Sequence, residues 1–158
     1  MEMPIPHDNS NIVSSWDVLN GQEVTGDCVV IGGGLVGAET AEYLANKGHQ
    51  VTIVEMMDKI AAGESTTVLP LMMKDFADHN VKQLVNTKVD HIENNIVYTA
   101  NEQIKADTII NALGSKKNIF DDSSITIPHV YVGDCSGERT ADIASAIRTA
   151  YHAANEIG

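Results

Sequence analysis

The sequence predicts an α/β fold in which a parallel sheet is flanked by helices and accompanied by an antiparallel β-meander. Two short runs rich in β-branched residues, 28–31 and 51–54, enclose a segment with helical spacing, which is the pattern of a βαβ unit. A third apolar run, 107–113, reads as another buried strand, and the short runs between 81 and 105 are separated by turn residues. A chain of 158 residues is long enough for one domain with a substantial core.

Three glycines stand where the first strand turns into the helix. Gly32, Gly34 and Gly37 form G-x-G-x-x-G: the first allows the sharp turn, the second lets a pyrophosphate approach the backbone, and the third lets the helix lie close to the strand. The helix start offers N–H groups and a positive dipole end to phosphates. Together they predict a Rossmann-like, FAD/NAD(P)-binding type of site; the alternative is a glycine turn that binds nothing. The predicted binding residues of this turn are Gly32, Gly33, Gly34, Leu35, Val36 and Gly37.

Glu55 ends the second strand, 23 residues after Gly32. An acid at this place can accept hydrogen bonds from the hydroxyls of the adenosine ribose. Its charge opposes a 2′-phosphate, and the next residues, 56–59, offer one Lys and no Arg. The sequence therefore favours NAD(H) over NADP(H). Met56 and Met57 follow at once and are candidates to cover the adenine.

The charge balance excludes several classes of partner. Ten basic and 22 acidic residues give a net charge of −12, which argues against binding to nucleic acid or anionic membranes. No run of 18 apolar residues occurs, so we expect a soluble, cytoplasmic protein. Cys28 and Cys135 are isolated, and the six histidines lack ligand spacing, so no metal site is predicted. The sequence leaves the oligomeric state open, a homo-oligomer included.

The first half of the chain is expected to start irregularly. Residues 1–26 hold no long periodic pattern, although Ser15 could cap a short helix turn through Leu19. After Glu55 we expect a mobile loop over 56–65. Apolar residues at helical spacing then predict a helix over 66–79, with Pro70 in its first turn.

The second half is predicted as a meander, one more parallel strand, and a final strand and helix. Strand 107–113 would run parallel to the first two strands and deliver Gly114 to the cofactor edge of the sheet. Strand 129–132 would lead to Gly133 and Asp134, before a helix over 141–157. The meander strands are 81–85, 88–92, 96–99 and 103–105, which we expect to pair antiparallel rather than through a second βα crossover. The expected inner face of the last helix is Ile143, Ala146, Ile147, Ala150, Ala154 and Ile157, with Ala144 and Ala153 beside it.

These pieces stand in an order that resembles a known family. The glycine motif with its acid, the meander, the sequence NALG at 111–114 and the sequence VGD at 132–134 are similar to the two-dinucleotide flavoprotein reductases of the pyridine-nucleotide–disulfide oxidoreductase type. Within them, the sequence resembles the C-terminal part of the NADH:flavin oxidoreductases (2-enoate reductase, 2,4-dienoyl-CoA reductase and trimethylamine dehydrogenase). The phrases IVSSWDVLNG, VIGGGLVGAETAEYLANKGHQVTIVE and VYVGDC…IASAIRTAYHAANEI extend this likeness over nearly the whole chain.

The resemblance implies a division of the chain and two dinucleotides. Residues 1–26 would be a lead-in from the flavin domain, 27–118 the NAD(H)-binding domain, and 119–158 a C-terminal remnant of the FAD-binding domain. In such enzymes the residues matching Gly133 and Asp134 contact FAD, and Gly114 lies toward the nicotinamide. The residue matching Glu39 lies near the nicotinamide as well; the alternative for Glu39 is an exposed acid in the first turn of a helix, favoured there by the helix dipole.

The sequence also departs from this family. The N-terminal barrel with its FMN, the cysteines for an iron–sulfur cluster and the first glycine motif of the flavin domain are absent, and Lys117 precedes Asn118 where the family usually has Pro. We therefore expect a fragment of a larger enzyme that passes hydride from NADH to FAD, with the missing barrel and flavin domains as its partners. The fragment alone would be inactive and would hold no FAD, and no residue is predicted to be catalytic. One alternative is a free-standing NAD(H)-binding or sensor module without turnover; another is a structural domain.

Overall fold

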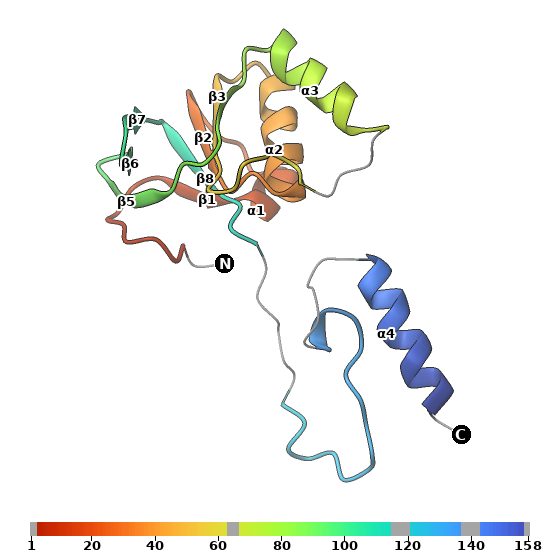
Figure 1. Cartoon of the computed structure of the whole chain (residues 1–158). Coiled ribbons are helices and arrows are strands. Elements are labelled where there is room, and N and C mark those ends of the chain that lie inside the picture. Colours follow the sequence, from red (N-terminus) through yellow and green to blue (C-terminus); the bar gives the residue numbers. More distant parts are fainter. Residues whose placement is uncertain (1–2, 63–66, 115–120, 137–142, 157–158) are drawn as a thin grey trace. The chain divides into compact units, whose positions relative to one another are not determined.

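The structure is a computed structural model, and the chain divides into two compact units, Met1–Gly114 and Ser115–Gly158 (Figure 1). Each unit is described by itself. The expected starts of the helices at Thr66 and Ala141, the end of the last helix at Ile157, and Lys117 and Asn118 lie outside the residues that the structure describes. These described residues are 3–62, 67–114, 121–136 and 143–156.

The first unit is built on a parallel sheet with the strand order β1-β8-β2-β3-β4. At its centre β2 (Cys28–Ile31) pairs with β3 (Val51–Val54) on one side and with β8 (Thr108–Asn111) on the other. The edge strands are β1 (Ile12–Ser14) and β4 (Lys82–Leu84). The α/β fold with a parallel sheet and a small antiparallel sheet, expected from the sequence, is confirmed.

Both faces of this sheet are covered, which explains why β2 and β8 are buried along their whole length. Helix α2 (Leu35–Asn46) packs on one face through small residues, and Val30 of β2 belongs to that cluster. Val29 and Ile31 point to the other face, where they join the core under the meander. Figure 1 shows α2 and α3 on one side of the sheet and β5–β7 on the other.

The N-terminal segment is more ordered than expected: the short helix expected through Leu19 is confirmed, whereas the strand over residues 12–14 was not expected from the sequence. Strand β1 pairs parallel with β8, with Ile12 opposite Ile109. Helix α1 (Ser15–Leu19) follows directly, capped by Ser14 rather than Ser15, since the Trp16 N–H donates to Ser14 Oγ. The strand forms because the open edge of β8 supplies its hydrogen-bond partners.

A second βα crossover is present, contrary to the expectation for residues 81–85. Helix α3 (Leu69–Asp78) connects β3 to β4, and these two strands pair parallel with Ile53 opposite Gln83. Strand β4 is an edge strand in which Lys82 and Gln83 are exposed. Such a short polar strand carries little pattern of its own; the preceding helix determines its direction.

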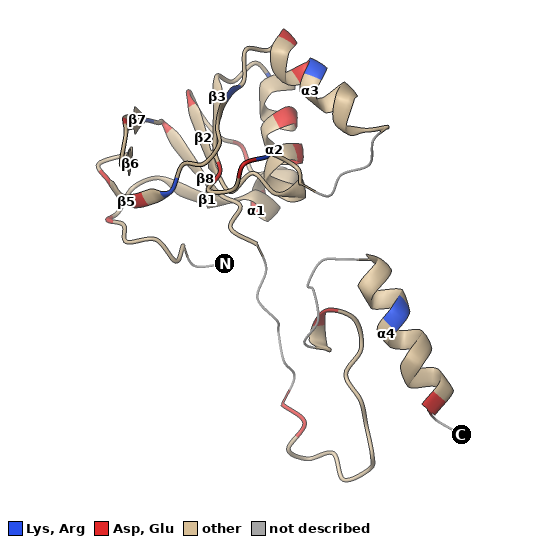
Figure 2. Cartoon of the chain, viewed as in Figure 1, with Lys and Arg blue, Asp and Glu red and all other residues tan. Residues whose placement is uncertain are grey.

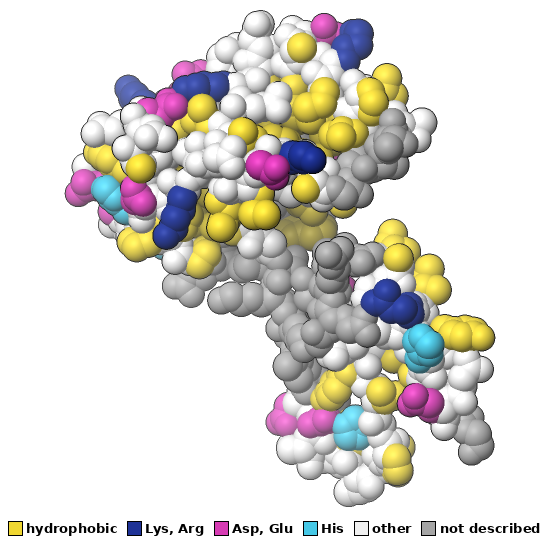
Figure 3. Space-filling model, in the orientation of Figure 1, with side chains coloured by type: hydrophobic (Ala, Val, Ile, Leu, Met, Phe, Trp, Pro, Cys, Tyr) yellow, Lys and Arg dark blue, Asp and Glu magenta, His cyan; other side chains and the backbone are white. Residues whose placement is uncertain are grey.

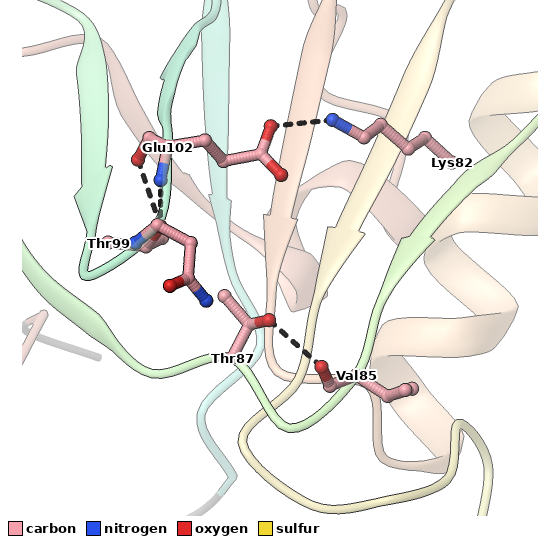
Figure 4. A network of polar contacts seen from close by, with 6 residues as sticks. Lys82, Val85, Thr87, Thr99 and Glu102 are labelled. Atoms are coloured by element: carbon pink, nitrogen blue, oxygen red, sulfur yellow. Dashed lines mark hydrogen bonds and ion pairs between the residues drawn. The ribbon is translucent and has the colours of Figure 1, made fainter.

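The remaining short strands form the predicted antiparallel meander, made of β5 (Val89–Glu93), β6 (Ile96–Thr99) and β7 (Gln103–Lys105). Its outer turn is attached to the parallel sheet by Glu102, whose carboxylate accepts a hydrogen bond from Lys82 Nζ at 2.6 Å (Figure 4). The same view shows Thr99 bound to the backbone of Glu102, which fixes that turn.

The second unit contains a 3-10 turn, η1 (Gly133–Cys135), and α4 (Ile143–Glu156). The expected strand at 129–132 is wrong: these residues have no regular secondary structure, and the Asp122 carboxylate holds the side chains of His129 and Tyr131. The expected inner face of α4 is wrong within this unit for Ile143 and Ile147, which are exposed, whereas Ala153, expected beside that face, is buried together with Ser145. Hydrophobic side chains are visible on the surface of this unit in Figure 3.

Acidic and basic residues are scattered along the described elements of both units, and the basic ones do not cluster in one element (Figure 2). This distribution agrees with the net charge of −12. Of the helices that the structure describes, none has the length and hydropathy needed to cross a membrane.

Candidate dinucleotide-binding site

A cavity of about 400 Å³ lies at the carboxyl ends of the parallel strands. In the sheet, β3 and β4 follow on one side of β2, whereas β8 lies on the other side of β2, so the strand order reverses at β2. Ligands of open α/β sheets bind in the crevice outside the strand ends at such a switch point. The cavity is lined by residues that follow four strands: Gly32 and Gly34 after β2, Glu55, Met56 and Met57 after β3, Thr87, Lys88 and Val89 after β4, and Ala112, Leu113 and Gly114 after β8.

The structure gives each glycine of the motif a physical reason. Gly32 has a φ of +102°, and a Cβ there would lie 2.6 Å from the Ala112 carbonyl oxygen. A Cβ on Gly37 would lie 1.9 Å from the Gly32 carbonyl oxygen, so α2 could not approach the strand. At Gly34 a Cβ would meet nothing within 4 Å. That open space beside the cavity is where a diphosphate can approach the backbone.

Glu55 is a buried acid, 9% exposed, held by two backbone groups. Its Oε2 accepts a hydrogen bond from the Gly33 N–H at 2.6 Å, and its Oε1 accepts one from the Met57 N–H at 2.7 Å. The sequence predicted Glu55 as a ribose ligand but not this link to the glycine turn. Each carboxylate oxygen can accept a further hydrogen bond, so the capacity to bind ribose hydroxyls remains.

The segment after Glu55 has no helix or strand over the described residues 56–62, as expected of a loop, and hydrogen bonds anchor it to the glycine turn; its mobility stays a prediction. The Ala61 N–H donates to the Gly33 carbonyl at 2.7 Å, and Ile60 and Ala61 are buried. Ala61 has a φ of +51°, so the chain turns sharply there to reach the glycine turn. Met56 lines the cavity but is 65% exposed, as expected of a residue at its mouth.

Thr87 and Lys88 are site residues that sequence reasoning missed. The Thr87 N–H donates to the Glu55 carbonyl at 2.9 Å, and the Asn86 N–H donates to the Met57 carbonyl at 2.8 Å. These bonds continue the pairing of β3 and β4 beyond the strand ends and bring residues 86–88 to the cavity. The signal in the sequence would have been the βα crossover through α3, which implies β4 beside β3.

On the opposite wall, the end of β8 supplies the predicted Gly114. The Ala112 N–H donates to the Ile31 carbonyl at 2.9 Å, so this segment still follows β2 beyond the strand. Asn111 Oδ1 accepts a hydrogen bond from the Leu113 N–H at 3.3 Å, and Gly114 has a φ of +84°. Gly114 therefore reaches the cavity edge, where the prediction placed it.

Helix α2 begins at Leu35 with Gly34 as its N-cap, and no side chain caps it. The first N–H groups of α2 thus lie beside the cavity-lining Gly34, which suits an anionic group. Glu39 is exposed and lies beyond the first turn of this helix, so the alternative of a first-turn acid is wrong. It is not among the residues that line the cavity, and its place near a nicotinamide stays a prediction.

Gly133 and Asp134 lie in the second unit. Gly133 has a φ of +62°, and its N–H donates to Thr149 Oγ1 at 2.9 Å, which ties η1 to α4. Asp134 is exposed within η1. Contact of Gly133 and Asp134 with FAD stays a prediction. Across the described residues of both units, no three His, Cys, Asp or Glu side chains come together to hold a metal ion.

Within the first unit, the observed groups fit NAD(H). The open space at Gly34 and the uncapped start of α2 suit a diphosphate, and Glu55 with two fixed hydrogen bonds suits a ribose. Apolar side chains such as Ile5, Val54 and Val89 complete the cavity, as is usual for a cofactor site.

Comparison with known proteins agrees with this geometry. Bilirubin reductase from Mediterraneibacter gnavus (strain CC55_001C) is 44% identical over 161 residues, which is 97% of this chain and 24% of that protein. Cinnamate reductase from Clostridium sporogenes is 31% identical over 159 residues, or 92% of this chain and 23% of the relative. NADH oxidase from Thermoanaerobacter brockii is 54% identical over 57 residues, or 34% of this chain and 9% of the relative.

Solved structures give the same result. A complex of 2-naphthoyl-CoA reductase with 2-naphthoyl-CoA superposes with a TM-score of 0.79 at 26% identity, covering 96% of this chain and 24% of that one. The chain thus spans about a quarter, or less, of the length of these relatives. The sequence model of the family described as pyridine nucleotide-disulphide oxidoreductase matches residues 3–156. Because this match covers nearly the whole chain, the protein belongs to the pyridine nucleotide-disulphide oxidoreductase family.

Proposed function

We propose that this chain is the NAD(H)-binding part of a flavin-dependent oxidoreductase that passes hydride from NADH to FAD. The observation on which the proposal rests is the cavity in which the open space at Gly34 and the fixed carboxylate of Glu55 lie at neighbouring strand ends. The family match and the NADH oxidase and reductase relatives support an oxidoreductase.

The residues of this chain would bind and orient the cofactor. The diphosphate would lie along Gly34 at the start of α2, with the adenosine ribose at Glu55 and Met56 against the adenine. The nicotinamide half would extend toward Leu113 and Gly114 on the other wall. When bound, NADH supplies a hydride from C4 of its nicotinamide, and FAD in the parent protein accepts it at N5. No acid or base of this chain is required, because the protein contributes position and exclusion of water.

The finer assignment is to the NADH:flavin oxidoreductases of the 2-enoate reductase and 2,4-dienoyl-CoA reductase type. It is supported by the match to cinnamate reductase, by the fold of 2-naphthoyl-CoA reductase and by the similarity that extends from the N-terminal segment to α4. By this assignment the parent protein also has FMN and an iron–sulfur cluster in parts beyond this chain, and Gly133 and Asp134 contact its FAD. A natural reading frame that extended upstream into a barrel with clustered cysteines would support it.

The binding step is tested by titrating NADH into the purified chain and following its fluorescence. We expect saturable binding, competition by ADP-ribose and no bound flavin in the absorbance spectrum. The absence of binding at about millimolar NADH, the upper end of ordinary substrate constants, would overturn the proposal.

The alternative of a sensor module without turnover predicts the same binding, so turnover must be measured in the longer polypeptide. NADH oxidation at the flavin there supports the reductase. NADH binding with no flavin reduction favours the sensor.

A further inference from the structure

Lys88 is the one basic residue among the described residues that line the cavity, and Glu55 is the one acidic residue. Apart from Thr87, the other lining residues are apolar or glycine. Lys59 is close to Glu55 in sequence but does not line the cavity. Charge effects on a ligand in this cavity therefore come first from Glu55 and Lys88.

The backbone places Lys88 beside the ribose end of the cavity. The preceding Thr87 is bonded to the Glu55 carbonyl, and the following Val89 is buried in β5. In the sheet order β2-β3-β4, the glycine turn follows β2, Glu55 follows β3 and Lys88 comes after β4. Lys88 thus lies on the side of Glu55 that faces away from the glycine turn.

This placement has a consequence for the ligand. Consider a dinucleotide bound with its diphosphate at the glycine turn and its adenosine ribose at Glu55. The 2′ substituent of that ribose would then lie farther from the glycine turn than the diphosphate does, on the side of β3 and β4. A 2′-phosphate there is opposed by the Glu55 carboxylate and by the net charge of −12. Lys88 is the cavity-lining group that attracts it.

We propose that Lys88 is a second specificity-determining residue of this site, which favours a 2′-phosphate where Glu55 opposes it. The inference rests on the proposed binding of NAD(H) and adds that the two residues together set the ratio of NADH to NADPH affinity. NADH stays preferred, because the Glu55 carboxylate is buried and fixed by two hydrogen bonds whereas Lys88 is exposed to solvent.

The test is a set of titrations with the Lys88→Gln variant of the full chain. We expect NADPH affinity to fall roughly two- to fivefold, as for an exposed ion pair, and NADH affinity to change less. The difference between the two cofactors is expected to shrink between about 0.05 and about 0.5 M salt, because screening weakens an exposed charge. The titrations are repeated with Lys88→Gln introduced into the Glu55→Gln variant. Removing the Glu55 charge is expected to raise NADPH affinity, which makes the effect of Lys88 easier to measure.

Two controls separate the 2′-phosphate from other causes. Lys105→Gln removes the same charge from an exposed position on β7 that does not line the cavity. Competition by 2′-AMP and 5′-AMP separates the two phosphate positions on the same nucleoside. Selective loss of NADPH and 2′-AMP binding in Lys88→Gln, absent from Lys105→Gln, supports the inference.

Other outcomes overturn it. Equal weakening of 2′-AMP and 5′-AMP binding would mean that Lys88 acts on the adenine base or through the overall electrostatic potential of the cavity, and not on the 2′-phosphate. The same shift in Lys105→Gln would reduce the effect to net charge. If NADH binds normally and the cofactor ratio is unchanged in Lys88→Gln, this inference alone is wrong. If the unaltered chain binds no NADH, the proposed function is wrong as well.

Discussion

The carboxylate of Glu55 accepts a hydrogen bond from the backbone N–H of Gly33 at 2.6 Å, across 22 residues of sequence. The bond joins the end of β3 to the glycine turn after β2. The Gly33 carbonyl in turn accepts a hydrogen bond from the Ala61 N–H, so the turn is held from both its donor and its acceptor side. The candidate ribose ligand is therefore also part of the framework that shapes the candidate phosphate site.

Replacing Glu55 with Ala should affect both stability and binding. The change leaves the Gly33 and Met57 N–H groups without their acceptor, and hydrogen bonds to a charged group contribute about 1.5–3 kcal/mol each. We expect the free energy of unfolding to fall by about 3–6 kcal/mol and NADH affinity to fall at least about tenfold. Urea unfolding with and without NADH measures both. Glu39→Ala, at an exposed helix position, is the matched control for stability; unchanged unfolding of Glu55→Ala would contradict the framework role.

The two cysteines should differ sharply in reactivity. Cys28 is 1% exposed in β2, and burial raises the pKa of its thiol to about 11, with the charges of Asp27 and Asp107 adding to the effect. Because the thiolate is the nucleophile, only about a thousandth of Cys28 is reactive at about pH 8. We expect iodoacetamide to alkylate Cys135, which is partly exposed, and to spare Cys28 until urea is added. Peptide mass spectrometry reads out each site; equal labelling of both in the folded chain would contradict the burial of β2.

The parts of the fold that could be predicted from sequence are those encoded by local patterns. The unit from β2 to β3 was recognisable because its strand, glycines, helix and acid stand in register, and β8 was recognisable as an uninterrupted apolar run. Strands β1 and β4 were missed or misplaced because each has three residues and lies at an edge. Their direction is set by partners far away in sequence, such as Ile109 for Ile12.

The site shows the same division. The glycines, Glu55 and Gly114 could be named from spacing, and the cavity includes Gly32, Gly34, Glu55 and Gly114 among its lining residues. Two other features of the site could not be predicted from spacing: the hydrogen bond from Gly33 to Glu55, and the position of Thr87 and Lys88 at the cavity. Both depend on how strand ends meet in space. For Asp134 the sequence predicted a position shortly before the last helix, but this position alone does not say which ligand an exposed acid contacts.

In the second unit, His129 should titrate above its ordinary value of 6.5. The Ile127 carbonyl next to Nδ1 and the Asp122 carboxylate 2.7 Å from Nε2 both favour the protonated ring and raise the pKa of His129. The hydroxyl of Tyr131, followed by His129, lowers the pKa of Asp122 below its ordinary 3.8. The cluster is thus stabilised most between these two titrations. Its His129 contribution is lost as pH rises through the raised pKa, and its Asp122 contribution is lost as pH falls through the lowered one.

Proton NMR of the histidine ring signals measures this directly. We expect the midpoint for His129 to lie above the ordinary 6.5 and to fall in Asp122→Asn. Asp121→Asn removes a neighbouring charge that is bonded to Ser123 instead, and is the matched control. A His129 midpoint that did not respond to Asp122→Asn would show that the contact is absent in solution.

Two glycine substitutions should separate folding from binding. A Cβ on Gly37 would stand 1.9 Å from the Gly32 carbonyl oxygen, a backbone atom that cannot move without displacing the strand-to-helix turn. We expect Gly37→Ala to lower the free energy of unfolding by about 1–3 kcal/mol, the usual cost of overpacking, or to prevent folding. A Cβ on Gly34 meets no protein atom within 4 Å, so Gly34→Ala should fold like the unaltered chain.

The same open space makes Gly34→Ala the sharper test of the site. Its methyl group would occupy the position where a diphosphate must approach the backbone, so we expect NADH and ADP-ribose affinity to fall at least about tenfold while the thermal midpoint stays unchanged. Calorimetric titration and thermal unfolding of the same preparations give both quantities. If Gly34→Ala folded normally and bound NADH as tightly as the unaltered chain, the phosphates would have to lie elsewhere, because no ligand can share the space of that methyl group.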